Sequence, residues 1–189
     1  TETTRRDYRQ LLFSTPGINQ YISGVILYDE TIRQSSLSGS SLVQILNEQG
    51  IMPGIKVDKG AKPLAGSPSE TVTEGLDSLR ERLEEYRTLG AYFTKWRAVL
   101  TIGSSLPSAN SIRVNAHALA RFAMLSQESK LVPIVEPEVL MDGNHTIKQC
   151  YSVTESVLKE VFYELGAQGV DFEGMLLKPN MVVSGNSSP

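Results

Sequence analysis

The chain has 189 residues, of which 40% are hydrophobic and 21% charged, and its formal net charge at pH 7 is −3. This composition is typical of one globular domain with a substantial core, and it lacks the basic excess of nucleic-acid-binding proteins. We therefore expect no nucleic-acid partner. No apolar stretch reaches the roughly 18 residues that a membrane span needs, so we also expect no membrane partner and no signal peptide.

Strand-like and helical patterns alternate along the chain. In chain order, the short runs rich in Val, Ile and Leu are Gly24–Tyr28, Gly54–Asp58, Phe93–Leu100, Val132–Val139 and Gly174–Asn180. Such runs are typical of strands buried on both faces of a parallel sheet. Apolar residues at helical spacing fall in the segments Arg5–Leu12, Leu42–Leu46, Val72–Leu89, Ile112–Ala123 and Val153–Leu165. Capping boxes are predicted at Thr71 with Glu74 and at Ser152 with Glu155.

This alternation predicts βα units and a parallel sheet. Charged residues on four of the strands are spaced 39, 41 and 42 residues apart, at Lys56, Lys95, Glu136 and Lys178. Five strands cannot close an eight-stranded barrel, so the pattern fits an open doubly wound sheet as well as part of a barrel. No G-x-G-x-x-G follows any strand, which argues against the open nucleotide-binding sheet.

Charged residues lie two apart on three strands, and side chains at that spacing point to the same face. The pairs are Lys56 with Asp58, Lys95 with Arg97, and Glu136 with Glu138. Lys178 ends the fifth strand, at the edge of a parallel sheet where ligands bind. One pair alone is readily explained as a satisfied ion pair. Four cations and three anions on one face are not, because each unpaired buried charge costs several kcal/mol.

These residue types suggest a reaction. Several cations together bind phosphate, and the guanidinium of Arg97 offers two parallel hydrogen bonds. A lysine among other cations loses its proton more readily and can then attack a carbonyl as an amine. Two neighbouring glutamates can hold different protonation states. The residues therefore indicate Schiff-base chemistry on a phosphorylated carbonyl compound.

Cysteine and histidine are scarce. A single cysteine, Cys150, permits no intramolecular disulfide, which favours a reducing, cytoplasmic compartment. Catalytic zinc usually takes three ligands rich in His or Cys, and the chain has only His117 and His145. Carboxylates could replace them, but we expect no metal and no cofactor. We expect Cys150 to be a small buried residue, His117 to lie on a helix surface, and Trp96 to pack between sheet and helices.

Five motifs resemble those of the class I fructose-bisphosphate aldolases. In order, they are GIKVDKG (54–60), PLAG (63–66), KWRAV (95–99), VPIVEPEVLMDG (132–143) and GMLLKPNMV (174–182). RRDYRQLL (5–12) also matches, so the resemblance runs from about Arg5 to Gly185. It implies a (β/α)8 TIM barrel, here incomplete with about strands 2 to 6, in a single partial domain over residues 1–189. Residues 184–189 would be a truncated polar tail, and the family's first strand, last two strands and C-terminal tyrosine would lie outside the chain.

The resemblance also implies catalytic roles. Lys178 matches the Schiff-base lysine, and Glu136 matches the general acid/base of carbinolamine formation and dehydration. Glu138 matches the neighbouring carboxylate that tunes the site. Lys95 and Arg97 match residues that contact substrate, and Lys95 would also assist proton transfer.

The remaining matches concern substrate binding. Lys56 matches a lysine that lines the site near a phosphate, and Asp58 would orient the surrounding cations. Arg5 resembles a substrate-associated arginine, although Arg6 could be the matching residue instead.

The implied function is reversible cleavage of fructose 1,6-bisphosphate into dihydroxyacetone phosphate and glyceraldehyde 3-phosphate, in glycolysis and gluconeogenesis. The family resemblance also implies a homo-oligomer, often a tetramer, in the cytoplasm. Two alternatives remain at this stage: a non-catalytic aldolase-like interaction module, and a Schiff-base aldolase for another sugar phosphate. A fragment without the remaining strands is expected to be a poor enzyme alone.

Overall fold

A five-stranded parallel sheet organises the molecule in the computed structural model, which describes residues 1–188. Its order is β1 (Gly24–Leu27), β2 (Met52–Lys56), β5 (Phe93–Leu100), β6 (Val132–Val139) and β7 (Leu176–Leu177). Every pairing between neighbours is parallel, which confirms the predicted βα organisation. The last strand is shorter than predicted, because β7 pairs with β6 only at Leu176 and Leu177.

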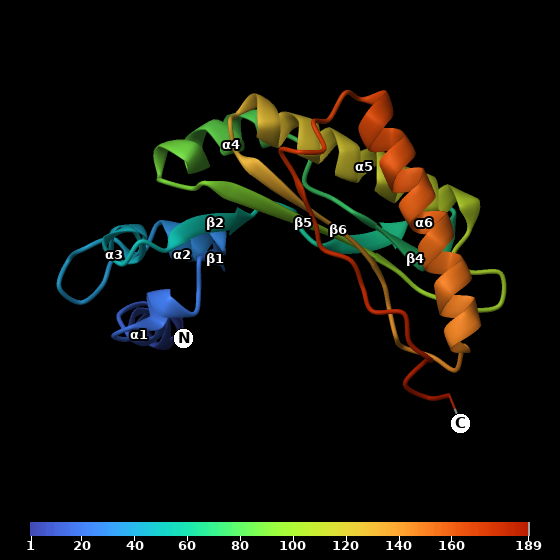
Figure 1. Ribbon diagram of the computed structural model, residues 1–189, viewed down its shortest axis with the longest axis horizontal. Coiled ribbons are helices and arrows are strands. Elements are labelled where there is room, and N and C mark those ends of the chain that lie inside the picture. The colour runs from blue at the N-terminus through green and yellow to red at the C-terminus, as the bar shows by residue number, and fades with distance from the viewer. Residues whose placement is uncertain (189) are drawn as a thin grey trace.

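Helices flank this sheet. They are α1 (Glu2–Phe13), α2 (Asp29–Ile32), α3 (Leu42–Glu48), α4 (Leu79–Thr88), α5 (Ala109–Glu128) and α6 (Ile147–Ala167), with a 3-10 turn at Ile18–Gln20. Figure 1 shows α4, α5 and α6 along the same side of the sheet. No helix among residues 1–188 combines the length and apolar character needed to cross a bilayer.

Buried and more exposed side chains alternate along β5. Thr94, Trp96, Ala98 and Leu100 are buried, whereas the residues between them are more exposed. Trp96 is completely buried and stacks on Phe122 of α5, with ring centroids 5.6 Å apart. The predicted packing of Trp96 between sheet and helices is therefore confirmed. Buried Cys150 and exposed His117 also lie as predicted, the latter beside Glu164 of α6.

Two predictions of helix starts are wrong. The segment expected to open a helix at Val72 instead forms a hairpin of β3 (Ala61–Leu64) and β4 (Ser67–Thr73), and α4 begins only at Leu79. Thr71 and Thr73 donate their hydroxyls to the carbonyls of Val99 and Arg97, so β5 holds this segment extended. Helix α6 also starts earlier than predicted, because Thr146 and Gln149 rather than Ser152 and Glu155 form its capping box.

A buried carboxylate fastens the hairpin to α5. Glu70 accepts hydrogen bonds from the hydroxyl of Ser67 at 2.7 Å and from the backbone amide and hydroxyl of Ser108, the N-cap of α5, at 2.7 and 2.6 Å. Burial raises the pKa of Glu70, but these hydrogen bonds outweigh it and hold the pKa below its usual value. Glu70 is therefore an ionised anchor.

Replacing this anchor is expected to destabilise the fold in a pH-dependent way. Glu70→Gln removes the charge-assisted bonds, so the free energy of unfolding should fall by about 1–3 kcal/mol at pH 7. Because the folded-state pKa is lowered, this stabilisation is complete above the unfolded-state pKa and is lost as the pH falls through the folded-state value. Urea unfolding at pH 7 and near pH 3 measures both effects. As a control, Glu155→Gln at an exposed i,i+4 pair should change stability by less than about 0.5 kcal/mol.

Candidate active site

Seven charged side chains come together on the sheet face opposite α5 and α6. They lie on, or directly after, four neighbouring strands, and they are Lys56, Asp58, Lys95, Arg97, Glu136, Glu138 and Lys178. The register explains the meeting, because parallel pairing places Arg97 opposite Glu136 and Lys56 opposite Lys95. The predicted convergence of these residues is thus present in the structure.

Glu136 is the centre of this cluster. Its carboxylate is buried, and it receives the amine of Lys178 at 2.5 Å on one oxygen and that of Lys95 at 2.8 Å on the other. Burial raises the pKa of Glu136, but the hydrogen bonds from Lys178 and Lys95 outweigh burial and keep the pKa below the usual value of glutamate. Glu136 is therefore ionised and positioned to take a proton from either amine.

Lys178 differs from the other two members in its accessibility. Its side chain is 58% exposed, whereas that of Glu136 is only 4% exposed. A molecule lying on the open face of the sheet can therefore reach the amine of Lys178, while Glu136 is shielded beneath it. This is the arrangement that a nucleophile and its proton acceptor require.

The other four charges form two linked ion pairs. Arg97 pairs with Glu138, which raises the pKa of the guanidinium above its usual value. Lys56 pairs with Asp58, whose buried carboxylate also accepts the backbone amides of Gly60 at 3.0 Å and Arg97 at 3.2 Å. Asp58 therefore ties the end of β2 to the middle of β5, directly beside the cations that it was predicted to orient.

The N-terminal arginines do not join this cluster. Arg5 lies on α1 and pairs with Glu30 at 3.0 Å, while Arg6 pairs with its neighbour Asp7 at 2.7 Å. Within residues 1–188, neither arginine contacts any of the seven charged side chains. A substrate-binding role for Arg5 stays a prediction from family resemblance.

A pocket of about 370 Å³ adjoins the cluster at the end of β2. It is lined by Lys56 and Asp58 and also by residues from α2 and α4, including Arg33 and Arg82. Arg82 donates to the carbonyl of Val57 at 2.9 Å and so holds the turn between Lys56 and Asp58. Sequence patterns gave no sign of this link, since Arg82 looks like one more exposed charge on an amphipathic helix.

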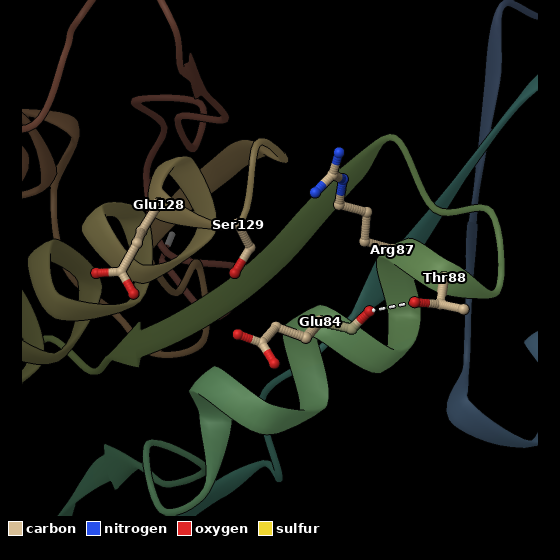
Figure 2. Close-up of a pocket in the computed structure, with 5 residues that line it drawn as sticks. All are labelled: Glu84, Arg87, Thr88, Glu128 and Ser129. Atoms are coloured by element: carbon tan, nitrogen blue, oxygen red, sulfur yellow. Dashed lines mark hydrogen bonds between the residues drawn. The ribbon is translucent and has the colours of Figure 1, made fainter.

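A larger pocket, of about 440 Å³, lies away from the charged cluster. Figure 2 shows its lining residues, which come from the end of α4 and the end of α5: Glu84, Arg87, Thr88, Glu128 and Ser129. These positions immediately precede β5 and β6, so the pocket opens at the amino-terminal ends of the strands. In parallel α/β folds the chemistry lies at the carboxyl ends, and we place the active site at the charged cluster.

The side chain of Asn180 makes a second contact near Lys178 that the sequence did not predict. Asn180 accepts a hydrogen bond from the backbone amide of Val139 and donates to the hydroxyl of Thr154 on α6, both at 3.2 Å. Its place two residues after Lys178 was the only available signal.

Comparison with known proteins gives a consistent result. The family model described as fructose-bisphosphate aldolase class-I matches residues 1–189. The chain is 60% identical to the probable fructose-bisphosphate aldolase class 1 of Xanthomonas campestris over 98% of this chain and 55% of that protein. It is 54% identical to cytosolic fructose-bisphosphate aldolase 5 of Arabidopsis thaliana over 100% of this chain and 52% of that protein.

A solved structure is similar across the same region. It is fructose-bisphosphate aldolase from Plasmodium falciparum, crystallised in complex with TRAP and a small-molecule inhibitor. The TM-score is 0.97 at 47% identity, covering 100% of this chain and 55% of that one. The chain thus spans about half the length of the relatives that it matches, and its five parallel strands form part of a (β/α)8 barrel.

Proposed function

Because this chain belongs to the class I fructose-bisphosphate aldolase family, we propose that the protein containing it cleaves fructose 1,6-bisphosphate reversibly through a Schiff base on Lys178. The products are dihydroxyacetone phosphate and glyceraldehyde 3-phosphate. The observation that carries the proposal is the contact of the accessible Lys178 amine with the buried, ionised Glu136 carboxylate at 2.5 Å.

The first half of the reaction uses this pair directly. Glu136 accepts a proton from Lys178, and the free amine adds to the C2 ketone of the sugar to give a carbinolamine. Glu136 then returns the proton to the carbinolamine hydroxyl, which leaves as water and produces an iminium ion. Lys95, 2.8 Å from the other oxygen of Glu136, keeps that carboxylate ionised and assists the transfers.

The second half uses the iminium as an electron sink. Glu136, a carboxylate again once water has left, takes the proton of the C4 hydroxyl. The C3–C4 bond then breaks and its electron pair moves into the enamine attached to Lys178. Glyceraldehyde 3-phosphate leaves, the enamine is protonated at carbon, and water hydrolyses the resulting iminium to release dihydroxyacetone phosphate. The amine of Lys178 is regenerated, so no cofactor is consumed.

Substrate phosphates need positive charge, which the remaining cations supply. Arg97 and Lys56 lie on neighbouring strands beside Lys178 and Lys95, each held by a carboxylate. We assign both to substrate binding, with Lys56 toward a phosphate and with Glu138 and Asp58 fixing their positions. Comparing turnover of fructose 1,6-bisphosphate, fructose 1-phosphate and sedoheptulose 1,7-bisphosphate tests this preference for two phosphates.

Borohydride trapping tests the Schiff base itself. Reducing the full-length protein with borohydride in the presence of dihydroxyacetone phosphate should attach one substrate molecule, less the oxygen lost as water, to Lys178, as peptide mass spectrometry would detect. The same treatment without substrate is the control and should leave Lys178 unmodified. Failure to find an adduct at Lys178 in a folded protein would refute the proposed mechanism.

The setting of the enzyme follows from the family. We propose a cytoplasmic homo-oligomer, most simply a tetramer. Support comes from plant relatives named as cytosolic isozymes and from the family resemblance. Light scattering on the full-length protein measures the oligomeric state, and a monomer at micromolar concentration contradicts this part of the proposal.

A further inference from the structure

The strand that carries Lys178 loses its backbone pairing at the position of the lysine itself. The Lys178 amide donates to the carbonyl of Val135 at 2.9 Å, next to Glu136 on β6. From residue 179 to residue 184 the main chain makes no backbone–backbone hydrogen bond within the described part of the chain. The next such bond is from Gly185 to His145, at 2.8 Å. β6 nevertheless continues to Val139, and because Pro137 has no amide hydrogen, Val139 carries the one amide at this end that faces β7 and needs another partner.

The Asn180 side chain takes over where this pairing stops. Its Oδ1 accepts the Val139 amide at 3.2 Å, which is a backbone group that a longer β7 would have satisfied. Its Nδ2 donates to the hydroxyl of Thr154 at 3.2 Å and to the carbonyl of Met181 at 3.0 Å. One amide therefore connects three segments: the end of β6, the middle of α6 and the loop after Lys178.

This bridge is rigid on the helix side. Thr154 is buried on α6, a helix of 21 residues that packs closely along α5, so its hydroxyl provides a fixed point. Val139 is also buried and lies three residues after Glu136 on the same strand. The backbone around Lys178 is thus fixed at two points, the amide of Lys178 itself and the side chain of Asn180. Both are hydrogen-bonded to β6, the strand that carries Glu136.

We infer that Asn180, with Thr154 behind it, is a positioning residue that fixes the Lys178 amine against Glu136. The inference rests on the proposed Schiff-base function and extends it. The amine must reach both Glu136 and a substrate carbonyl. The Lys178 side chain has four rotatable torsions and is 58% exposed, so packing restrains it little. A fixed backbone is therefore what limits the positions of this amine. Errors of about 1 Å in such positions can cost up to about 100-fold in rate.

The test compares variants of the full-length protein. Asn180→Ala should lower kcat and the rate of borohydride-trapped adduct formation with dihydroxyacetone phosphate by about 10- to 100-fold, with KM within about threefold of wild type. Thr154→Val, which removes only the hydroxyl, should lower kcat by about two- to fivefold. Thr154→Ser, which keeps the hydroxyl, should recover most of that loss. Because the two residues share one bond, the double variant should be less impaired than independent effects predict.

A matched control separates positioning from general stability. Gln127 on α5 also bridges with its side-chain amide, donating to the Asp171 carbonyl at 2.7 Å and accepting the Asp171 amide at 3.0 Å. This bridge fixes the loop that leads into β7, at the opposite end of the strand from Lys178. Gln127→Ala should lower the thermal midpoint about as much as Asn180→Ala while leaving kcat within about twofold of wild type.

Each result decides the question. Equal losses of kcat in Gln127→Ala and Asn180→Ala, or an unchanged kcat in Asn180→Ala, overturn the inference. If Asn180→Ala does not fold, the contrast between Thr154→Val and Thr154→Ser decides, and equal activity of these two variants rejects the role. If wild-type protein forms no adduct at Lys178, the proposed function and this inference both fail. An adduct in wild type with normal kcat in all variants rejects the inference alone.

Discussion

Lys178→Met is expected to abolish aldol cleavage, with kcat falling by about 10⁴- to 10⁶-fold, as happens when a covalent nucleophile is removed. Methionine has a similar length and no amine, so it cannot form a carbinolamine. It also leaves Glu136 with Lys95 as its remaining cation partner. Steady-state cleavage of fructose 1,6-bisphosphate, coupled to detection of glyceraldehyde 3-phosphate, measures the loss.

Two further variants isolate the amine from its charge. Lys178→Arg keeps a cation beside Glu136 but cannot act as a neutral nucleophile, because the guanidinium of arginine stays protonated near neutral pH. It should therefore be as inactive as Lys178→Met and should form no borohydride adduct. Lys159→Met, at an exposed lysine of α6, should retain wild-type activity. Substantial cleavage by Lys178→Arg would show that this lysine acts only through its charge.

Glu136→Gln is the substitution with the next largest expected effect. The amide cannot accept the proton of Lys178 or return it to the carbinolamine hydroxyl, so kcat should fall by about 10²- to 10⁴-fold. Lys178 is still present, so an adduct can still be trapped, but its rate of formation should fall in parallel with kcat. Stopped-flow mixing with dihydroxyacetone phosphate, followed by borohydride quenching at set times, measures this rate.

The control must separate proton transfer from loss of folding, because Glu136 is buried between two cations. Glu155→Gln on the exposed face of α6 should leave both rates unchanged. Circular dichroism should show native secondary structure for Glu136→Gln at the assay temperature. A folded Glu136→Gln protein that forms the adduct at the wild-type rate contradicts the acid/base role of this residue.

The strands were the most predictable part of the fold. Phe93–Leu100 and Val132–Val139 were predicted to the residue, because each is a short segment rich in β-branched or aromatic residues, with the charged residues of the site interspersed among them. The hairpin was missed for a physical reason. Val72, Leu76 and Leu79 fall at helical spacing, but Val72 pairs with Lys62 of β3, and its neighbours Thr71 and Thr73 are hydrogen-bonded to β5 and α5. Tertiary hydrogen bonds, absent from local patterning, decided between the two structures.

The charged cluster was predictable as a set but not as a network. Residues two apart on a strand must share a face, so the sequence could place Lys95 with Arg97 and Glu136 with Glu138. Which carboxylate meets which amine depends on strand register across 41 or 42 residues of intervening chain. The Asn180 bridge illustrates the same limit, since its partners Val139 and Thr154 lie in other elements.

The alternation along β5 has a consequence for how such an enzyme can change. Trp96 and Ala98 face the helices and are completely buried, while Lys95 and Arg97 lie between and beside them on the open face. Substitutions at the buried set of positions act on packing. Under the proposed function those at the open set act on bound substrate, and the two sets touch different neighbours. Natural selection can therefore vary the preferred sugar phosphate through every second residue while the intervening ones preserve the fold. Divergence in substrate use and conservation of architecture can then proceed on the same eight residues.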